Sequence, residues 1–201
     1  MKLDRYEQRK KRVNIIITIV VGFLMVASIF AYVIFDTGQS NNELSYNKFT
    51  FQTVNNGYRT KINGAYYDFT YYPSELERIN ISNDIAGKLM NAQGIIFVFD
   101  PNETIDNLQY SDYVRLDLSK QLTTPVIFGI TEPSNTYTSM MVLGCTNATA
   151  QYPFILLNIS SSSTFEQDSK YPDCIIMNAK LKEIIALKDR LVYRMLGVMT
   201  N

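Results

Sequence analysis

The sequence contains no histidine at all, and it has only two cysteines among 201 residues. Without histidine, Ser-His-Asp triads, Cys-His proteases and histidine-ligated zinc, haem or copper sites are excluded in their usual forms. Two cysteines are too few for an iron–sulfur cluster or a structural zinc site. The side chains that remain for catalysis are therefore carboxylates, lysines and tyrosines.

Sequence signatures of several other protein classes are missing as well. The chain has no GxGxxG, Walker A or nucleophile-elbow pattern. The first 35 residues carry six of the 19 basic and two of the 19 acidic side chains, which leaves 13 basic and 17 acidic residues after them. This net charge of −4, without a cluster of lysine and arginine, argues against nucleic acid binding.

Only one long hydrophobic run is present. Residues 13–35 (VNIIITIVVGFLMVASIFAYVIF) contain no charged side chain, and a helix of about 20 apolar residues crosses the roughly 30 Å core of a bilayer. The run therefore predicts a transmembrane helix. The six basic residues before it predict its orientation, with residues 1–12 as a cytoplasmic tail and the rest of the chain outside the cell membrane. A cleavable signal peptide, whose apolar core has about 7–15 residues, and a type IV pilin leader are the alternatives.

The chain after this run divides into a linker and a domain. Residues 36–47 (DTGQSNNELSYN) are mostly polar and have no apolar periodicity, so they are expected to form a short linker. Residues 48–201 are about 150 residues, enough for one globular domain with its own core.

The domain begins with a pattern typical of antiparallel strands. Residues 49–54, 58–62 and 65–72 are rich in β-branched and aromatic side chains. Asn56-Gly57 and Asn63-Gly64 between them favour tight hairpin turns, so we predict a three-stranded meander. Its last strand would place Ala65, Tyr67, Phe69 and Tyr71 on one face and Tyr66, Asp68, Thr70 and Tyr72 on the other. An exposed tyrosine row would suit a sugar or a protein partner, whereas tyrosines more often bridge core and water.

The middle of the domain alternates helix-like and strand-like segments. Residues 82–93 predict a short helix capped by Ser82 or Asn83. A second helix is predicted over 104–122, with its apolar residues at Ile105, Leu108, Val114, Leu118 and Leu122. Two continuous apolar runs, 95–99 (IIFVF) and 126–130 (VIFGI), are typical of strands buried on both faces. Further strands are expected at 137–143, 154–158 and 174–177.

The chain ends with the strongest amphipathic pattern, over residues 181–198. Its apolar stripe is expected to consist of Leu181, Ile184, Ile185, Leu191, Val192, Met195 and Leu196, opposite Lys182, Glu183, Lys188, Asp189 and Arg190. The stripe would pack on the sheet or receive a partner helix. Together the segments predict an α/β or α+β domain with a mixed sheet, which begins with an antiparallel meander and ends in an amphipathic helix.

The two cysteines are the best candidates for side-chain chemistry. Cys145 and Cys174 both lie in the part predicted to be exported, where an even number of cysteines favours a disulfide. Closing this loop of about 30 residues would stabilise the domain by roughly 3–4 kcal/mol. The closed loop would contain the serine-rich segment 160–164. A catalytic thiol is the alternative, but it would lack a histidine base.

Among the carboxylates, Asp100 is the most suggestive. It directly follows the run 95–99, and sites in α/β proteins gather at the carboxyl ends of strands. With Pro101 and Asn102 beside it, Asp100 is also compatible with an ordinary turn. Asp106, Asp112 and Asp117 are spaced to point to different sides of a helix, so they predict no metal site. We therefore predict no catalytic, cofactor-binding or metal-binding residue.

Four Asn-x-Ser/Thr sequences lie in the part predicted to be outside the cell, at Asn80, Asn102, Asn147 and Asn158. They are acceptor patterns for N-glycosylation, and they also arise by chance in chains rich in Asn, Ser and Thr. All four fit a cell-surface glycoprotein.

Four segments of the domain carry a resemblance to other proteins: FQTVNNGYRTKING, IIFVFDPN, GCTNAT with Cys145, and LKDRLVYRMLGVM. In these segments the chain resembles a group of small archaeal single-pass membrane proteins. The resemblance implies one membrane anchor and an archaeal setting, and it implies no catalytic residues.

The sequence thus predicts a membrane-anchored binding or assembly module whose domain meets a protein partner at the cell surface. A membrane-tethered enzyme that uses carboxylates on cell-surface glycans is the main alternative. An accessory subunit whose anchor helix packs in a larger membrane complex is another.

Overall fold

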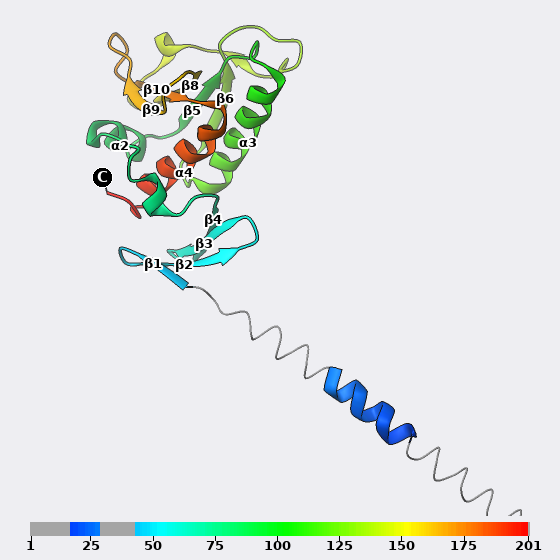
Figure 1. The fold of residues 1–201 in the computed structure, drawn as a ribbon. Coiled ribbons are helices and arrows are strands. Elements are labelled where there is room, and N and C mark those ends of the chain that lie inside the picture. Colours follow the sequence, from blue (N-terminus) through cyan, green and yellow to red (C-terminus); the bar gives the residue numbers. More distant parts are fainter. Residues whose placement is uncertain (1–16, 29–42, 201) are drawn as a thin grey trace, which may run out of the picture. The chain divides into compact units, whose positions relative to one another are not determined.

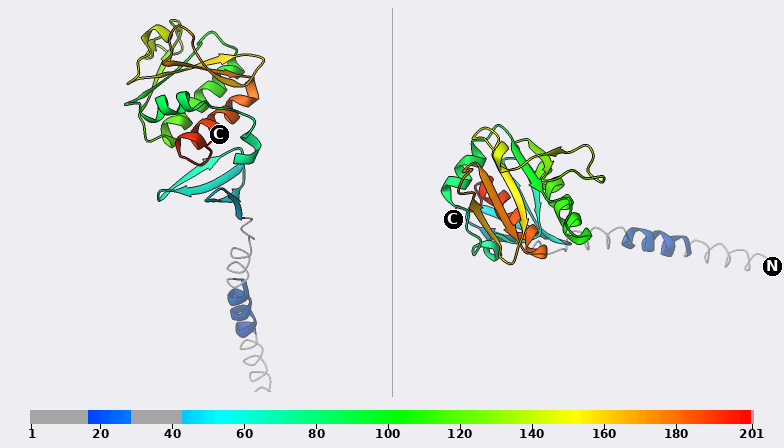
Figure 2. Two further views of the ribbon diagram at one scale, coloured as in Figure 1. Left: turned by 90° about the vertical axis from the view of Figure 1, so that its left-hand side faces the viewer. Right: turned by 90° about the horizontal axis from the view of Figure 1, so that it is seen from above.

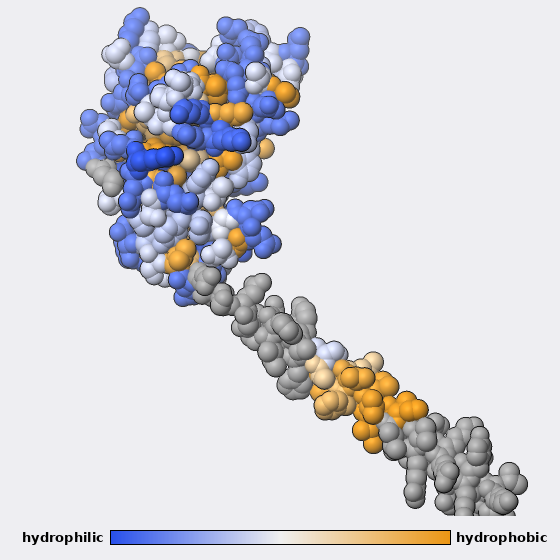
Figure 3. All heavy atoms as spheres, viewed as in Figure 1, coloured by the Kyte–Doolittle hydropathy of each residue, from blue (hydrophilic) through white to orange (hydrophobic). Residues whose placement is uncertain are grey.

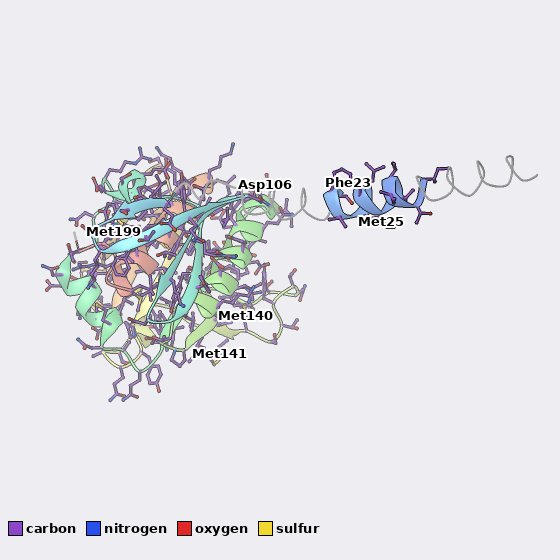
Figure 4. The ribbon with its side chains drawn as sticks, turned by 90° about the horizontal axis from the view of Figure 1, so that it is seen from below. Phe23, Met25, Asp106, Met140, Met141 and Met199 are labelled. Carbon is purple, nitrogen blue, oxygen red and sulfur yellow. A yellow bond between two sulfur atoms is a disulfide. The ribbon has the colours of Figure 1, made fainter. Side chains whose placement is uncertain are left out.

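The computed structural model describes residues 17–28 and 43–200, and the chain divides into two units, Met1–Asn42 and Glu43–Asn201. In the first unit residues 17–28 form a helix, from which Phe23 and Met25 project (Figure 4). Across the described ranges, no helix is both long enough and apolar enough to cross a membrane. The basic tail 1–12, the two ends of the predicted transmembrane segment 13–35 and linker residues 36–42 lie outside the described residues.

The second unit begins with a four-stranded antiparallel sheet, which confirms the predicted meander and adds one strand to it (Figure 1). In chain order its strands are β1 (Glu43–Tyr46), β2 (Phe49–Val54), β3 (Gly57–Ile62) and β4 (Ala65–Phe69). Strand β1 falls inside the segment that we expected to be linker. It forms because Leu44 and Tyr46 pair with Phe51 and Phe49 of β2.

The turn between β3 and β4 follows the expected Asn-Gly chemistry. Asn63 has a φ of 50° and Gly64 a φ of 88°, the left-handed conformations that a two-residue hairpin turn requires. Gly57 has a different role: a Cβ built on it would lie 2.0 Å from the carbonyl oxygen of Phe69. Only glycine allows β3 and β4 to approach this closely.

The larger sheet has six strands in the order β7-β6-β5-β8-β10-β9. Their bounds are β5 (Ile95–Phe99), β6 (Val126–Ile130), β7 (Met141–Val142), β8 (Phe154–Ile159), β9 (Thr164–Gln167) and β10 (Cys174–Ala179). Every neighbouring pair is parallel except β10 and β9. This sheet is therefore mixed, as predicted.

Two strand predictions in this sheet need correction. The strand expected over 137–143 is reduced to Met141–Val142, because most of that segment is a loop that returns from β6. Strand β9 was not predicted. It is short and polar (TFEQ), and it exists because its backbone pairs with the edge of β10.

Three helices cover one face of the larger sheet (Figures 1 and 2). They are α2 (Asn83–Met90), α3 (Ile105–Gln121) and α4 (Ile184–Met195), accompanied by short 3₁₀ turns at Pro73–Leu76, Cys145–Asn147 and Leu181–Glu183. The hydroxyls of Ser82 and Thr104 cap α2 and α3 by accepting from the third backbone N–H of each helix.

Helix α4 lies between the larger sheet and the meander. The ring of its Tyr193 stacks on Phe69 of β4 at 3.9 Å between centroids and meets Phe51 of β2 edge-on at 6.0 Å. On its other side, Leu187 and Leu191 belong to the same buried core as Phe97 of β5. The meander, the helices and one face of the sheet therefore share a single core.

The opposite face of the sheet has a smaller core of its own. Val98, Phe154 and Cys174 are buried there, with Leu143 and Tyr171 packed against them. No helix contributes to this cluster within the described part of the chain. Instead, the segment that carries Cys145 covers the face.

Candidate functional site

The most unusual feature of the domain is a run of charged residues inside it. Lys188, Asp189 and Arg190 of α4 each have 0% of their surface exposed. We expected these three side chains on the polar side of an amphipathic helix, and that expectation is wrong. Because the sheet lies on one side of α4 and the meander on the other, the helix has no side facing water there.

Lys188 and Asp189 join three elements of the domain. The Lys188 ammonium lies 2.6 Å from Oδ2 of Asp117 on α3, and it also forms an ion pair with Asp189. Oδ2 of Asp189 accepts hydrogen bonds from the backbone N–H groups of Thr70 (2.8 Å) and Tyr71 (2.9 Å). These two amides therefore leave the β-ladder, which explains why β4 ends at Phe69 rather than continuing to residue 72.

The two partners respond to burial in different ways. Burial lowers the pKa of the Lys188 amine, but the charges of Asp189 and Asp117 outweigh this effect, so the pKa is raised overall. Burial raises the pKa of the Asp189 carboxyl, and Lys188 and the two amides only partly offset that effect. Lys188 is thus held as a cation between two acidic side chains, Asp117 and Asp189.

A hollow of about 240 Å³ opens beside this network. It lies between the meander and α3 and is lined by Val54, Asn56, Asp68, Phe69, Thr70, Tyr113 and Asp117. Its two carboxylates already have cationic partners, since Asp117 pairs with Lys188 and Asp68 with Arg59 at 2.6 Å. The lining therefore offers hydrogen bonds and an aromatic surface rather than an unbalanced charge.

The outward face of α3 is more apolar than its sequence pattern predicts. Ile105, Tyr113 and Leu116 are 70%, 47% and 46% exposed. Ile105 was expected on the buried stripe, but polar residues occupy part of the buried side instead: Asn107, Ser111 and Gln121. A second hollow, of about 290 Å³, lies on this surface and is lined by Gln109, Tyr110, Tyr113 and Ile185.

The tyrosines of the meander do not form an exposed row. Tyr66 is 67% exposed and lies on the outer face, where the Lys61 ammonium is 5.5 Å from its ring centroid. Tyr72, expected on that same face, turns inward because β4 has ended, and its ring packs 5.3 Å from both Phe51 and Tyr58. The outer face still has a hollow of about 300 Å³, lined by Glu43, Thr50, Gln52, Arg59, Thr60, Lys61 and Tyr66.

Asp100 lies at the carboxyl end of β5, as expected from the sequence. Its Oδ1 accepts from the backbone N–H of Asn102 at 2.8 Å, which is the geometry of a turn. The side-chain amide of Asn102 donates to Glu132, which follows β6, at 2.9 Å. The parallel sheet thus brings Asp100 and Glu132 to the same Asn102, although they are far apart in the sequence.

The three aspartates of α3 separate, as their spacing predicts. Asp112 pairs with Arg115 at 2.7 Å and accepts from the hydroxyl of Tyr137 at 3.0 Å, while Asp117 pairs with Lys188. Asp106 is exposed in the first turn of the helix (Figure 4). In residues 17–28 and 43–200, no group of three or more metal-ligating side chains is close enough to hold an ion.

The predicted disulfide is present. Cys145 and Cys174 are bonded, with 5.2 Å between their Cα atoms. The bond fixes the 3₁₀ turn Cys145–Asn147 to the first residue of β10, on the sheet face opposite the helices. Neither sulfur is therefore a free thiol.

The four asparagines of the glycosylation patterns are all exposed, but their side-chain amides differ. The amide nitrogen of Asn102 donates to Glu132, and that of Asn158 donates to Asn178 on β10 at 2.7 Å. Asn147 instead uses its oxygen, which accepts from the backbone of Gly144. Asn80 lies just before the cap of α2.

Comparison of the chain with protein-family models, with curated proteins and with solved structures finds no match in any of the three.

Proposed function

We propose that this protein is a membrane-anchored binding module, which holds its C-terminal domain outside the cell membrane for a protein partner. The observation that carries the proposal is the exposed apolar helix 17–28. Eight of its side chains are between 48% and 72% exposed: Ile17, Ile19, Val20, Val21, Phe23, Leu24, Met25 and Val26. In the space-filling view this helix is apolar, while the surface of the domain is mostly polar (Figure 3).

A helix that is apolar on every side needs an apolar environment around it. Residues 13–35 are uncharged and long enough for a bilayer, and the basic cluster at 9–12 precedes them. The anchor therefore runs through residues 13–35, with the N-terminus in the cytoplasm.

The surface of α3 is the part of the domain best suited to a partner. Ile105, Tyr113 and Leu116 place apolar groups in water beside the hollow at Ile185, and clustered exposed apolar residues mark contact sites. Tyrosine is also common at the centre of protein interfaces. A protein partner that covers Tyr113 and Leu116 would remove this surface from water.

A second candidate is a tethered enzyme that uses carboxylates, and one observation favours it. Asp100 and Glu132 approach the same asparagine at the carboxyl ends of neighbouring parallel strands, the usual place for α/β sites. An enzyme would lose its activity in Asp100→Asn or Glu132→Gln, whereas a binding module would keep its cellular phenotype in both variants.

Two experiments on cells that express this protein test the proposal. Protease added to intact cells should degrade the domain after residue 36 and leave an epitope placed on the 1–12 tail; full protection of the domain would refute the topology. A photo-crosslinking amino acid at Tyr113 should give a defined protein adduct, while the same group at Tyr66, exposed on the outer face of the meander, should not. Identical patterns from both positions would refute the α3 surface.

A further inference from the structure

Two arginines on α4 have buried nitrogens that lack an acceptor. Arg190 has none of its surface exposed; its Nε donates to the carbonyl of Ile79 at 2.8 Å, but among the described residues Nη1 and Nη2 have no partner. One turn later, Nε of Arg194 is also buried and has no partner in the part of the chain that the structure describes. Most buried polar groups in proteins are paired, so three such nitrogens in one place need an explanation.

The positive charges of Arg190 and Arg194 are as poorly compensated as their hydrogen-bond donors. A guanidinium stays protonated in proteins, and burying it without a carboxylate is unfavourable. Within the described ranges neither arginine takes part in an ion pair. Burial lowers the pKa of Arg190, and the positive charge of Arg194 lowers it further. Among the described residues, three nitrogens of the pair therefore lack an acceptor, and neither guanidinium has a carboxylate partner.

The N-terminus of α2 lies beside this pair. Nη2 of Arg194 donates to the side chain of Asn83, the first residue of that eight-residue helix, at 2.6 Å. Backbone N–H groups at a helix N-terminus attract anions. Asp84 in the same turn is exposed and forms no ion pair with either arginine. The guanidinium of Arg194 thus lies at the N-terminus of α2, with Arg190 one turn earlier on α4, and in the described part of the chain no carboxylate pairs with either.

We propose that Arg190 and Arg194 bind a phosphate group at the N-terminus of α2. A phosphate supplies several acceptor oxygens and the missing negative charge at once, and the planar guanidinium fork matches its geometry. A water molecule would satisfy N–H groups but would leave two neighbouring positive charges uncompensated.

The phosphate has two sources, inorganic phosphate and a lipid headgroup. Binding of a headgroup would require the anchor to lie in lipid or detergent, whereas binding of free phosphate would not depend on the anchor.

The test is thermal unfolding of the full chain in maltoside detergent, which contains no phosphate. One arm adds inorganic phosphate, with chloride at matched ionic strength as the reference. The other arm adds phosphatidic acid to the micelles, with a neutral diacylglycerol as the reference. A ligand that binds the folded state raises the unfolding midpoint, so we expect a rise of several degrees in at least one arm.

Variants decide whether the rise comes from this site. Arg190→Met should abolish it and should itself unfold at a higher temperature than the native chain without phosphate, because the uncompensated buried charge is gone. Arg194→Gln should weaken the rise, and it is the second variant if Arg190→Met does not fold. Arg59→Met removes an exposed arginine of the meander and should leave the rise unchanged.

A rise with inorganic phosphate supports a free anion, and a rise with phosphatidic acid alone supports a headgroup. No rise in either arm, or an equal rise in the native chain and in Arg194→Gln, overturns the proposal.

Discussion

Removing the charge of Asp189 is the most direct test of the buried network. Asp189→Asn keeps the shape of the side chain but leaves the Lys188 ammonium with Asp117 as its one carboxylate partner. The new amide group must also turn its NH₂ toward Lys188 or toward the N–H groups of Thr70 and Tyr71, so donors face donors on one side. Breaking a buried ion pair from one side typically costs about 3–5 kcal/mol.

This loss is a large part of the total, because a domain of this size is stabilised by about 5–15 kcal/mol. With a urea dependence of about 2 kcal/mol per molar, the unfolding midpoint should fall by about 2 M urea. The assay is urea unfolding of the full chain in detergent, followed by circular dichroism. Asp68→Asn is the matched control, because its partner Arg59 and Asp68 itself are 44% and 58% exposed and water screens the pair.

A double variant separates the ion pair from the rest of the site. In Lys188→Met with Asp189→Asn, the buried cation is gone together with the carboxylate, so the loss should be smaller than the sum of the two single losses. The reasoning is refuted if Asp189→Asn unfolds at the same urea concentration as Asp68→Asn, or if the two single losses simply add.

Three further predictions concern other parts of the domain. The hydrogen bond from Arg59 lowers the pKa of Asp68, so the pair should stabilise the protein above about pH 4 and stop doing so as the pH falls through that lowered pKa. The difference in urea midpoint between the native chain and Asp68→Asn should therefore shrink from pH 7 to pH 3. A constant difference contradicts this. Tyr193→Phe removes the 2.8 Å hydrogen bond to the carbonyl of Tyr71 and should cost about 0.5–1.5 kcal/mol in the same assay; no loss would mean that water replaces the bond. Replacing Cys145 and Cys174 together by serine opens a link between residues 29 apart and should cost about 3–4 kcal/mol; an unchanged midpoint would show that packing alone holds this face.

Local patterns predicted most of the strands and helices correctly. Aromatic and β-branched runs such as 49–54 and 95–99 are strands with those bounds, because each pairs with neighbours that have the same character. Strands β1 and β9 were not predicted. Each forms because it pairs with the edge of a neighbouring strand, β2 or β10, rather than because of its own composition. Pairing between segments that are far apart is not visible in a local pattern.

The sequence of α4 indicates that the helix is buried, although the apolar stripe considered alone does not. Besides the expected stripe, Ala186, Leu187 and Tyr193 are also apolar, so residues 188–190 and Arg194 are the charged positions of an otherwise apolar helix. A helix of this kind belongs inside a protein. What the sequence could not supply was the partners, because Asp117 and the amides of Thr70 and Tyr71 come from other elements.

The buried charges have a consequence that an apolar core would not have. Hydrophobic contacts allow a helix to slide or turn by small amounts, whereas Asp189 accepts from two consecutive amides in one position only. Those amides belong to the meander, and Lys188 carries the same constraint to α3 through Asp117. The outward surface of α3, with Tyr113 and Leu116, is therefore held in a fixed orientation to the meander before any partner arrives. A surface that is already ordered loses less entropy on binding, and this connects the costly burial of charge to the binding function proposed for the domain.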